Sequence, residues 1–306
     1  MQLISDIRQY YIDQFTALPA DKQFHFATRL SAWQSLPFCA QHLDTVKPSY
    51  VKSSKEITRD LSNLLTNPPA AKINAAAARQ PYFDKYPDLR GLMLALFRTR
   101  HLLAVYNYDA RPLLLNLYPL ERMQALCDQL LDDTEALKVL STYAINYLYL
   151  VDSILFPVEE RPLPVATFTE LGTTYDTTKP EHVQLMIYFY THCIIGASNF
   201  YTTPILQSFE EYRAMLATLE QLIGQHFSAI NLDNKFEFLV CCRIIGFNSS
   251  LYDRIYDEAA RSVSQDGTFV IDRHNAHKQS NKTSFADSEH RNVLLIMSAT
   301  AYPYQR

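Results

Sequence analysis

The chain has 306 residues, of which 48% are hydrophobic and 20% charged, and its formal net charge is −4. This length allows one large domain or two ordinary ones, and the composition predicts a sizeable core rather than disorder. Lys and Arg are scattered with no basic stripe, which argues against a nucleic-acid partner. The six glycines form neither the dinucleotide-binding motif nor the P-loop motif, so those nucleotide sites are unsupported.

The first residues, MQLISDIRQYYIDQF, carry charges where a signal peptide would be apolar. The five cysteines include no C-x-x-C pair, which favours reduced thiols and a cytoplasmic location. Residues 183–209 contain no formally charged side chain, but several polar side chains interrupt them. This stretch therefore predicts a buried helix that breaks at Pro204, and no membrane span.

Apolar residues recur with helical spacing through most of the chain, whereas the alternation typical of strands is nearly absent. The predicted helices cover, in chain order, residues 3–16, 21–36, 50–65, 69–79, 88–105, 117–131, 133–154, 181–202, 208–227, 234–247, 249–263 and 287–300. One short extended piece is expected at residues 268–272. The sequence thus predicts an all-α protein.

Residues 157–180 are the main interruption of this pattern, with four prolines and six threonines. Unstructured segments this long are usually lids, binding loops or linkers. We expect a loop here that divides a single helical domain, residues 1–306, into an N-terminal and a C-terminal half. No repeat of fixed period is present.

Several predicted helices are apolar nearly all round, which is typical of helices buried on all sides. Tyr149 and Asp152 share one face of such a helix, and Tyr188 and His192 share one face of the next. Arg243 lies in a third apolar run, where a guanidinium needs a carboxylate or several carbonyl groups as partners. These helices are expected to form the inner of two helical layers.

The last predicted helix begins with Asp287 and Ser288, either of which can cap its first free N–H groups. His290 then lies one turn inside, on the same face as Leu294 and Met297. A helix N-terminus disfavours the charged imidazole and attracts anions. His290 is therefore the leading candidate for a functional histidine.

The segment 264–292 concentrates acids and bases, including three of the nine histidines. A carboxyl and an imidazole in a partly dry site can have their pKa values pushed apart, as acid–base catalysis requires. We predict His290, Asp272, His192 and Asp152 as catalytic residues, and Arg243, His274, Tyr149, Tyr188 and Glu289 as substrate contacts, with no metal ligand and no cofactor. The alternative roles are structural: a core histidine, turn residues, a helix cap and core tyrosines.

The run Ser264-Gln265-Asp266-Gly267-Thr268-Phe269 follows a predicted helix, and with the helix number and the apolar helices it carries a resemblance. It resembles the turn motif of (α/α) toroid proteins such as terpenoid cyclases and prenyltransferases, and the architecture also resembles six-hairpin glycosidases. The resemblance implies a two-layer (α/α) barrel or toroid, complete or incomplete. No D-x-D-D or D-D-x-x-D motif is present, which disfavours the isoprenoid reactions.

Three functions stay open at this point. The first is a pocket enzyme that uses acid–base chemistry on a small polar substrate, carbohydrates included. The second is a non-catalytic binding or accessory protein with the same fold. The third is a metal-dependent or isoprenoid-type enzyme. A small-molecule ligand is the expected partner, and the sequence leaves the oligomeric state open.

Overall fold

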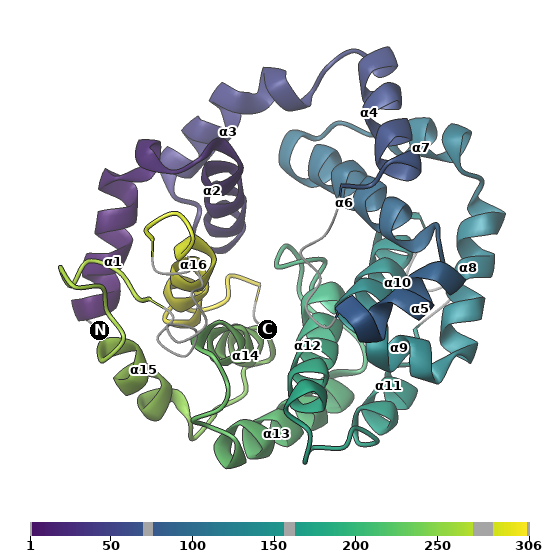
Figure 1. Cartoon of the computed structure of the whole chain (residues 1–306). Coiled ribbons are helices and arrows are strands. Elements are labelled where there is room, and N and C mark those ends of the chain that lie inside the picture. Colours follow the sequence, from purple (N-terminus) through teal and green to yellow (C-terminus); the bar gives the residue numbers. More distant parts are fainter. Residues whose placement is uncertain (1, 70–75, 156–162, 272–283, 305–306) are drawn as a thin grey trace. The chain divides into compact units, whose positions relative to one another are not determined.

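The computed structural model describes residues 2–69, 76–155, 163–271 and 284–304. They form sixteen α-helices, one short 3-10 helix and one isolated β-bridge, so the prediction of an all-α protein is confirmed. No helix within these ranges is long and apolar enough to cross a membrane. The chain divides into two compact units, coloured in Figure 1 along the sequence: unit 1 is 1–44 with 201–306, and unit 2 is 45–200.

Unit 1 is built around helix α16, which is buried along almost its whole length. Figure 1 shows α16 between α2 and α14. The helices of this unit are α1 (Gln2–Asp13), η1 (Phe15–Ala17), α2 (Ala20–Gln34), α13 (Phe209–Gln225), α14 (Leu232–Ile245), α15 (Tyr252–Ala260) and α16 (Glu289–Ser298). Helix α3 (Pro37–Tyr50) follows α2 and continues into unit 2.

Helices α2 and α16 run in the same direction, because contacts join their first turns and also their last. His25 of α2 meets Glu289 at the start of α16, and Trp33 Nε1 donates to Thr300 Oγ1, 2.9 Å away, just beyond its end. The N-terminal ends of both helices therefore bring their side chains to one end of unit 1.

Helix α14 runs in this direction too. Asp233 in its first turn accepts a hydrogen bond from Arg291 at 2.8 Å, and Arg243 near its end donates to the Ser298 carbonyl at 2.7 Å. Three parallel helices thus form the core of unit 1, with α16 in the middle.

Unit 2 has a similar core of α6, α10 and α12. Its helices are α4 (Ser54–Thr66), α5 (Ala76–Lys85), α6 (Leu89–Tyr106), α7 (Arg111–Leu117), α8 (Leu120–Asp132), α9 (Thr134–Leu140), α10 (Thr142–Leu155), α11 (Val165–Gly172) and α12 (Pro180–Ala197). Ser141, before α10, donates to the Leu185 carbonyl in the first turns of α12, and Arg100 in α6 donates to Asn199 after α12. Tyr149 packs on Gly196 near the end of α12, so α10 and α12 run in the same direction. Phe83 before α6 contacts Tyr143 at the start of α10, and Arg111 after α6 donates to the Ile154 carbonyl near the end of α10, so α6 runs parallel to them.

Several predictions about helix boundaries were wrong. The segment 133–154 is two helices, because Ser141 between them has a φ of +45° and its hydroxyl bonds the neighbouring helix. Residues 157–180 contain helix α11, in which Val165, Phe168 and Leu171 bury one face. Helices α3 and α7 were not predicted. The break after residue 197 comes before Pro204, at three successive residues of positive φ, Asn199 to Tyr201.

Candidate functional site

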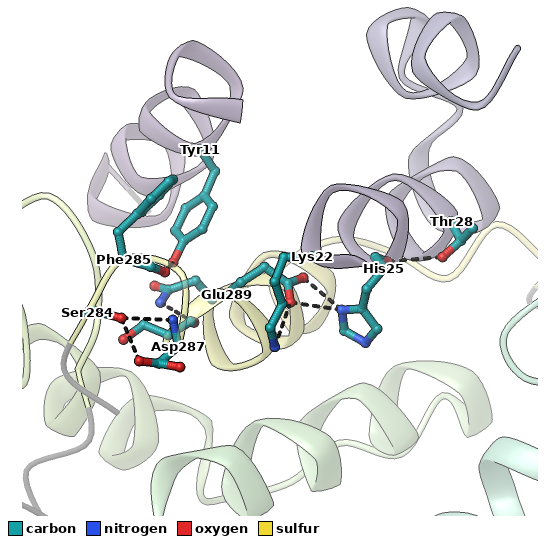
Figure 2. Close-up of polar contacts among 10 residues, drawn as sticks. Tyr11, Lys22, His25, Thr28, Ser284, Phe285, Asp287 and Glu289 are labelled. Carbon is teal, nitrogen blue, oxygen red and sulfur yellow. Dashed lines mark hydrogen bonds and ion pairs between the residues drawn. The ribbon is translucent and has the colours of Figure 1, made fainter. Parts of the chain in front are cut away.

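The turn before α16 fixes the start of this helix. Ser288 occupies the N-cap position but makes no side-chain cap bond, and Asp287 instead accepts from the Ser284 hydroxyl at 2.7 Å. The predicted capping role of these two residues was therefore wrong. Tyr11 donates to the Phe285 carbonyl at 3.1 Å, which ties the turn to α1 (Figure 2).

The segment that resembled the toroid turn motif packs against α16 through one buried amide. The isolated bridge joins Val263 to Val270, and Gly267 between them adopts a φ of +75°, which a glycine adopts without strain. Asn292 accepts from the Val270 N–H and donates to its carbonyl, both at 2.9 Å. This amide takes the place of a strand partner and holds the hairpin beside the start of α16.

Glu289 is the centre of the candidate site. Its side chain is 0% exposed, and its two carboxyl oxygens lie 2.8 and 3.0 Å from Nδ1 of His25. Lys22 Nζ lies 3.7 Å from the same carboxyl, on the same helix as His25 (Figure 2). A buried carboxyl thus faces an imidazole and an ammonium that are each 32% exposed and so reach solvent.

A second imidazole stands beside the first. The rings of His25 and His290 are 5.4 Å apart between centroids, and His290 is half-buried. Neither His25 Nε2 nor any His290 nitrogen hydrogen-bonds a residue in the ranges given above. Within the described part of the chain, two imidazoles next to one buried carboxyl therefore keep ring nitrogens available for a bound molecule.

Burial shifts the pKa values of this cluster in opposite directions. It raises the pKa of Glu289 to about 7, although the neighbouring His290, Lys22 and Arg29 each favour its ionised form. It lowers the pKa of both His25 and His290 well below the ordinary value, and the positive charge of Arg29 lowers each further. Both imidazoles are therefore neutral at pH 7, while the carboxyl is half protonated.

The protonation of Glu289 decides which nitrogen of His25 can act as a base. A protonated carboxyl donates to Nδ1, so the neutral ring must carry its proton on Nε2. An ionised carboxyl accepts from Nδ1–H, so Nε2 keeps its lone pair. Loss of one proton near pH 7 therefore turns the solvent-facing nitrogen of His25 into a hydrogen-bond acceptor and a general base.

The structure distributes the predicted site residues over both units. Glu289 and His290 come together in unit 1. Arg243 is also in unit 1 but at the other end of α16, where it bonds the Ser298 carbonyl and lies 4.6 Å from the Tyr252 ring centroid. Asp272 and His274 lie outside the described residues. The remaining four, His192, Asp152, Tyr149 and Tyr188, belong to unit 2.

The predicted residues of unit 2 lie on α10 and α12. His192 Nδ1 is 2.8 Å from Asn146 Oδ1, and the Tyr188 ring lies 6.4 Å from the His192 ring. Burial raises the pKa of Asp152 to about 6. Tyr149 is 4% exposed and covers Gly196, where an added Cβ would meet its ring carbon at 2.4 Å. Tyr149 therefore packs the two helices together.

Three residues of the site, His25, Lys22 and Arg29, were not predicted, and all three lie on α2. Their spacing of three and four residues places them on one face of the helix, next to the buried stripe of Phe26 and Leu30. Such a polar face ordinarily faces solvent. The signal that could have found it is a histidine between two cations beside an apolar stripe.

No group of three His, Cys, Asp or Glu side chains within the described ranges is placed to hold a metal ion. Comparison of the chain with family models, with curated proteins and with solved structures found no match.

Proposed function

We propose that unit 1 carries an acid–base enzyme site that acts on a small polar substrate, with carbohydrates among the candidates. The observation that carries the proposal is the buried Glu289 carboxyl, held 2.8 Å from Nδ1 of a solvent-accessible His25. An ordinary surface ion pair would not bury its carboxyl group as Glu289 is buried. A purely structural buried pair would leave no histidine nitrogen exposed to solvent.

The residues have separate roles in this proposal. His25 takes a proton from the substrate through Nε2, and Glu289 positions the ring and selects its tautomer. His290, whose ring centroid is 5.4 Å from that of His25, returns a proton to the leaving or rearranging group. Both imidazoles are neutral at pH 7, so His290 donates from an N–H and is reprotonated from solvent.

A two-layer (α/α) barrel or toroid, complete or incomplete, is part of the same proposal. Each unit has three parallel buried helices, and the ends of such helices form the site in proteins of that architecture. The end of α2 and α16 that carries His25 and Glu289 is the N-terminal end of both helices. The support for this architecture comes from the parallel helices within each unit.

The test is an activity screen with matched variants. Wild type, His25→Gln and His226→Gln are assayed on nitrophenyl glycosides, esters and phosphates. His226 is the control, because it lies in the same unit at the C-terminal end of α13. We expect His25→Gln to lose roughly 10²–10⁴-fold in kcat/KM, and His226→Gln to keep full activity.

A pH profile separates the positioning role of Glu289 from a structural one. In wild type, kcat/KM should rise with pH through an acid limb centred near the Glu289 pKa of about 7. Glu289→Gln should lose this limb. Full activity of His25→Gln contradicts the proposal, and if wild type transforms no compound of the panel, a non-catalytic binding protein becomes the better description.

A further inference from the structure

Arg29 is a cation beside the two imidazoles, and its charge lowers the pKa of each. Its guanidinium donates to the Tyr201 hydroxyl at 3.3 Å and lies 5.2 Å from the centroid of that ring. Tyr201 is 6% exposed, so it holds one side of the guanidinium from within unit 1. No carboxylate in the described part of the chain lies within 4.0 Å of Arg29, which is itself half-buried.

The position of Arg29 on α2 relates it to the reacting nitrogen. It follows His25 by four residues, so the two side chains share a face and start about 6 Å apart along the helix axis. A molecule that contacts His25 Nε2 and extends by one small ring therefore reaches the guanidinium. Lys22 lies on the other side of His25, three residues earlier, and is already near Glu289.

Other charged groups near the imidazoles limit what Arg29 can bind. Glu237 on α14 and Asp21 at the start of α2 act electrostatically on this cluster, together with Glu289. Lys22 and Arg29 would repel a cationic substrate, and a neutral substrate would offer no negative charge to the Arg29 guanidinium. A planar guanidinium presents several N–H donors in the geometry that a carboxylate or phosphate accepts.

We propose that Arg29 anchors the substrate by binding a carboxylate or phosphate group on it, while His25 acts on a position about one sugar ring away. This inference rests on the proposed function, because it places the anion relative to the reacting nitrogen of His25. It narrows the substrate to small polar molecules that carry one oxyanion.

The test measures binding to the full chain by calorimetry, with glucose 6-phosphate, glucuronate and glucose as probes. Wild type is compared with Arg29→Gln, Arg29→Lys and the control Arg254→Gln. Arg254 belongs to the same unit but lies over the Phe227 ring, 3.7 Å from its centroid. Melting curves of the four proteins confirm that each variant is folded.

We expect wild type and Arg254→Gln to bind at least one of the two anions and glucose at least tenfold more weakly. Arg29→Gln should lose at least tenfold in affinity for that anion. Arg29→Lys should bind it with an affinity between those of wild type and Arg29→Gln, because an ammonium lacks the paired, planar N–H donors of a guanidinium. Binding of glucose 6-phosphate alone identifies a phosphate, and binding of glucuronate alone a carboxylate.

Three results would overturn the inference: neither anion binds, glucose binds as tightly as the anions, or Arg29→Gln binds as wild type does. Binding and catalysis fail separately in these experiments. An intact anion site together with full activity of His25→Gln would remove the proposed acid–base role and keep the anchor. Loss of activity in His25→Gln, when wild type binds neither anion, would keep the acid–base role and remove the anchor.

Discussion

Replacing Glu289 by glutamine should make the protein more stable at alkaline pH. The glutamine keeps the size of the side chain and can still accept from His25 Nδ1–H, but it cannot ionise. In wild type the carboxyl is 0% exposed, and burial raises its pKa from 4.5 to about 7. The folded protein therefore holds this proton more tightly than the unfolded chain does.

The sign and size of the effect follow from this difference. Below pH 4.5 both states are protonated and Glu289 has no ionisation cost. As pH rises from 4.5 to 7 the unfolded chain ionises this carboxyl while the folded protein keeps it protonated, so stability falls, and the loss is complete above pH 7. A difference of about 2.5 pKa units corresponds to about 3 kcal/mol above pH 7. Glu289→Gln should thus match wild type near pH 4.5 and exceed it by about 3 kcal/mol at pH 8.

The assay is thermal and urea unfolding of wild type and Glu289→Gln between pH 5 and 8. The control is the exposed Glu210→Gln in the same unit. For a chain of this length the gain at pH 8 corresponds to roughly 5 °C in Tm. A difference that does not change with pH, or a Glu289→Gln variant less stable than wild type at pH 8, would refute the reasoning. Glu289 would then be a stabilising ionised partner of Lys22 and His25.

Three further predictions concern other residues. His290→Ala should leave Tm unchanged at pH 8 and raise it at pH 5.5, measured by calorimetry, because the lowered pKa of this histidine costs stability as pH falls below the ordinary value. Asn292→Ala should cost about 2–4 kcal/mol in urea unfolding, since it leaves the buried N–H and carbonyl of Val270 without their partner. Asp152→Asn should gain about 1–2 kcal/mol at pH 7 and nothing at pH 3.5, because burial raises the pKa of this partly exposed carboxyl to about 6.

The helical periodicity of the sequence predicts most of the fold, but it does not predict where buried helices break. Ser141 interrupts a continuous apolar run without any glycine or proline, because its backbone and hydroxyl fit against α12. Helix α11 was hidden among prolines and threonines, which are typical of loops. Tertiary contacts decided the outcome in both places.

The sequence predicted the residues that α16 contributes to the candidate site, but not those of α2. Glu289 and His290 were identified from the unusual concentration of acids and bases before the last apolar helix. His25 lies 264 residues away from Glu289 in sequence, and only the parallel packing of α2 against α16 joins them. Arg243 shares the apolar context of these residues, yet it lies at the far end of α16, because its position along α14 differs by ten residues from that of Asp233.

The proton shared by Glu289 and His25 can be observed directly by ¹⁵N NMR of the imidazole ring, with histidine-labelled protein and His25→Gln for assignment. We expect the neutral His25 ring to carry its proton on Nε2 at pH 5.5 and on Nδ1 at pH 8, with a midpoint near the Glu289 pKa of about 7. In Glu289→Gln this titration should disappear. A wild-type His25 that becomes an imidazolium below pH 6.5, or that keeps one tautomer at every pH, would contradict the account.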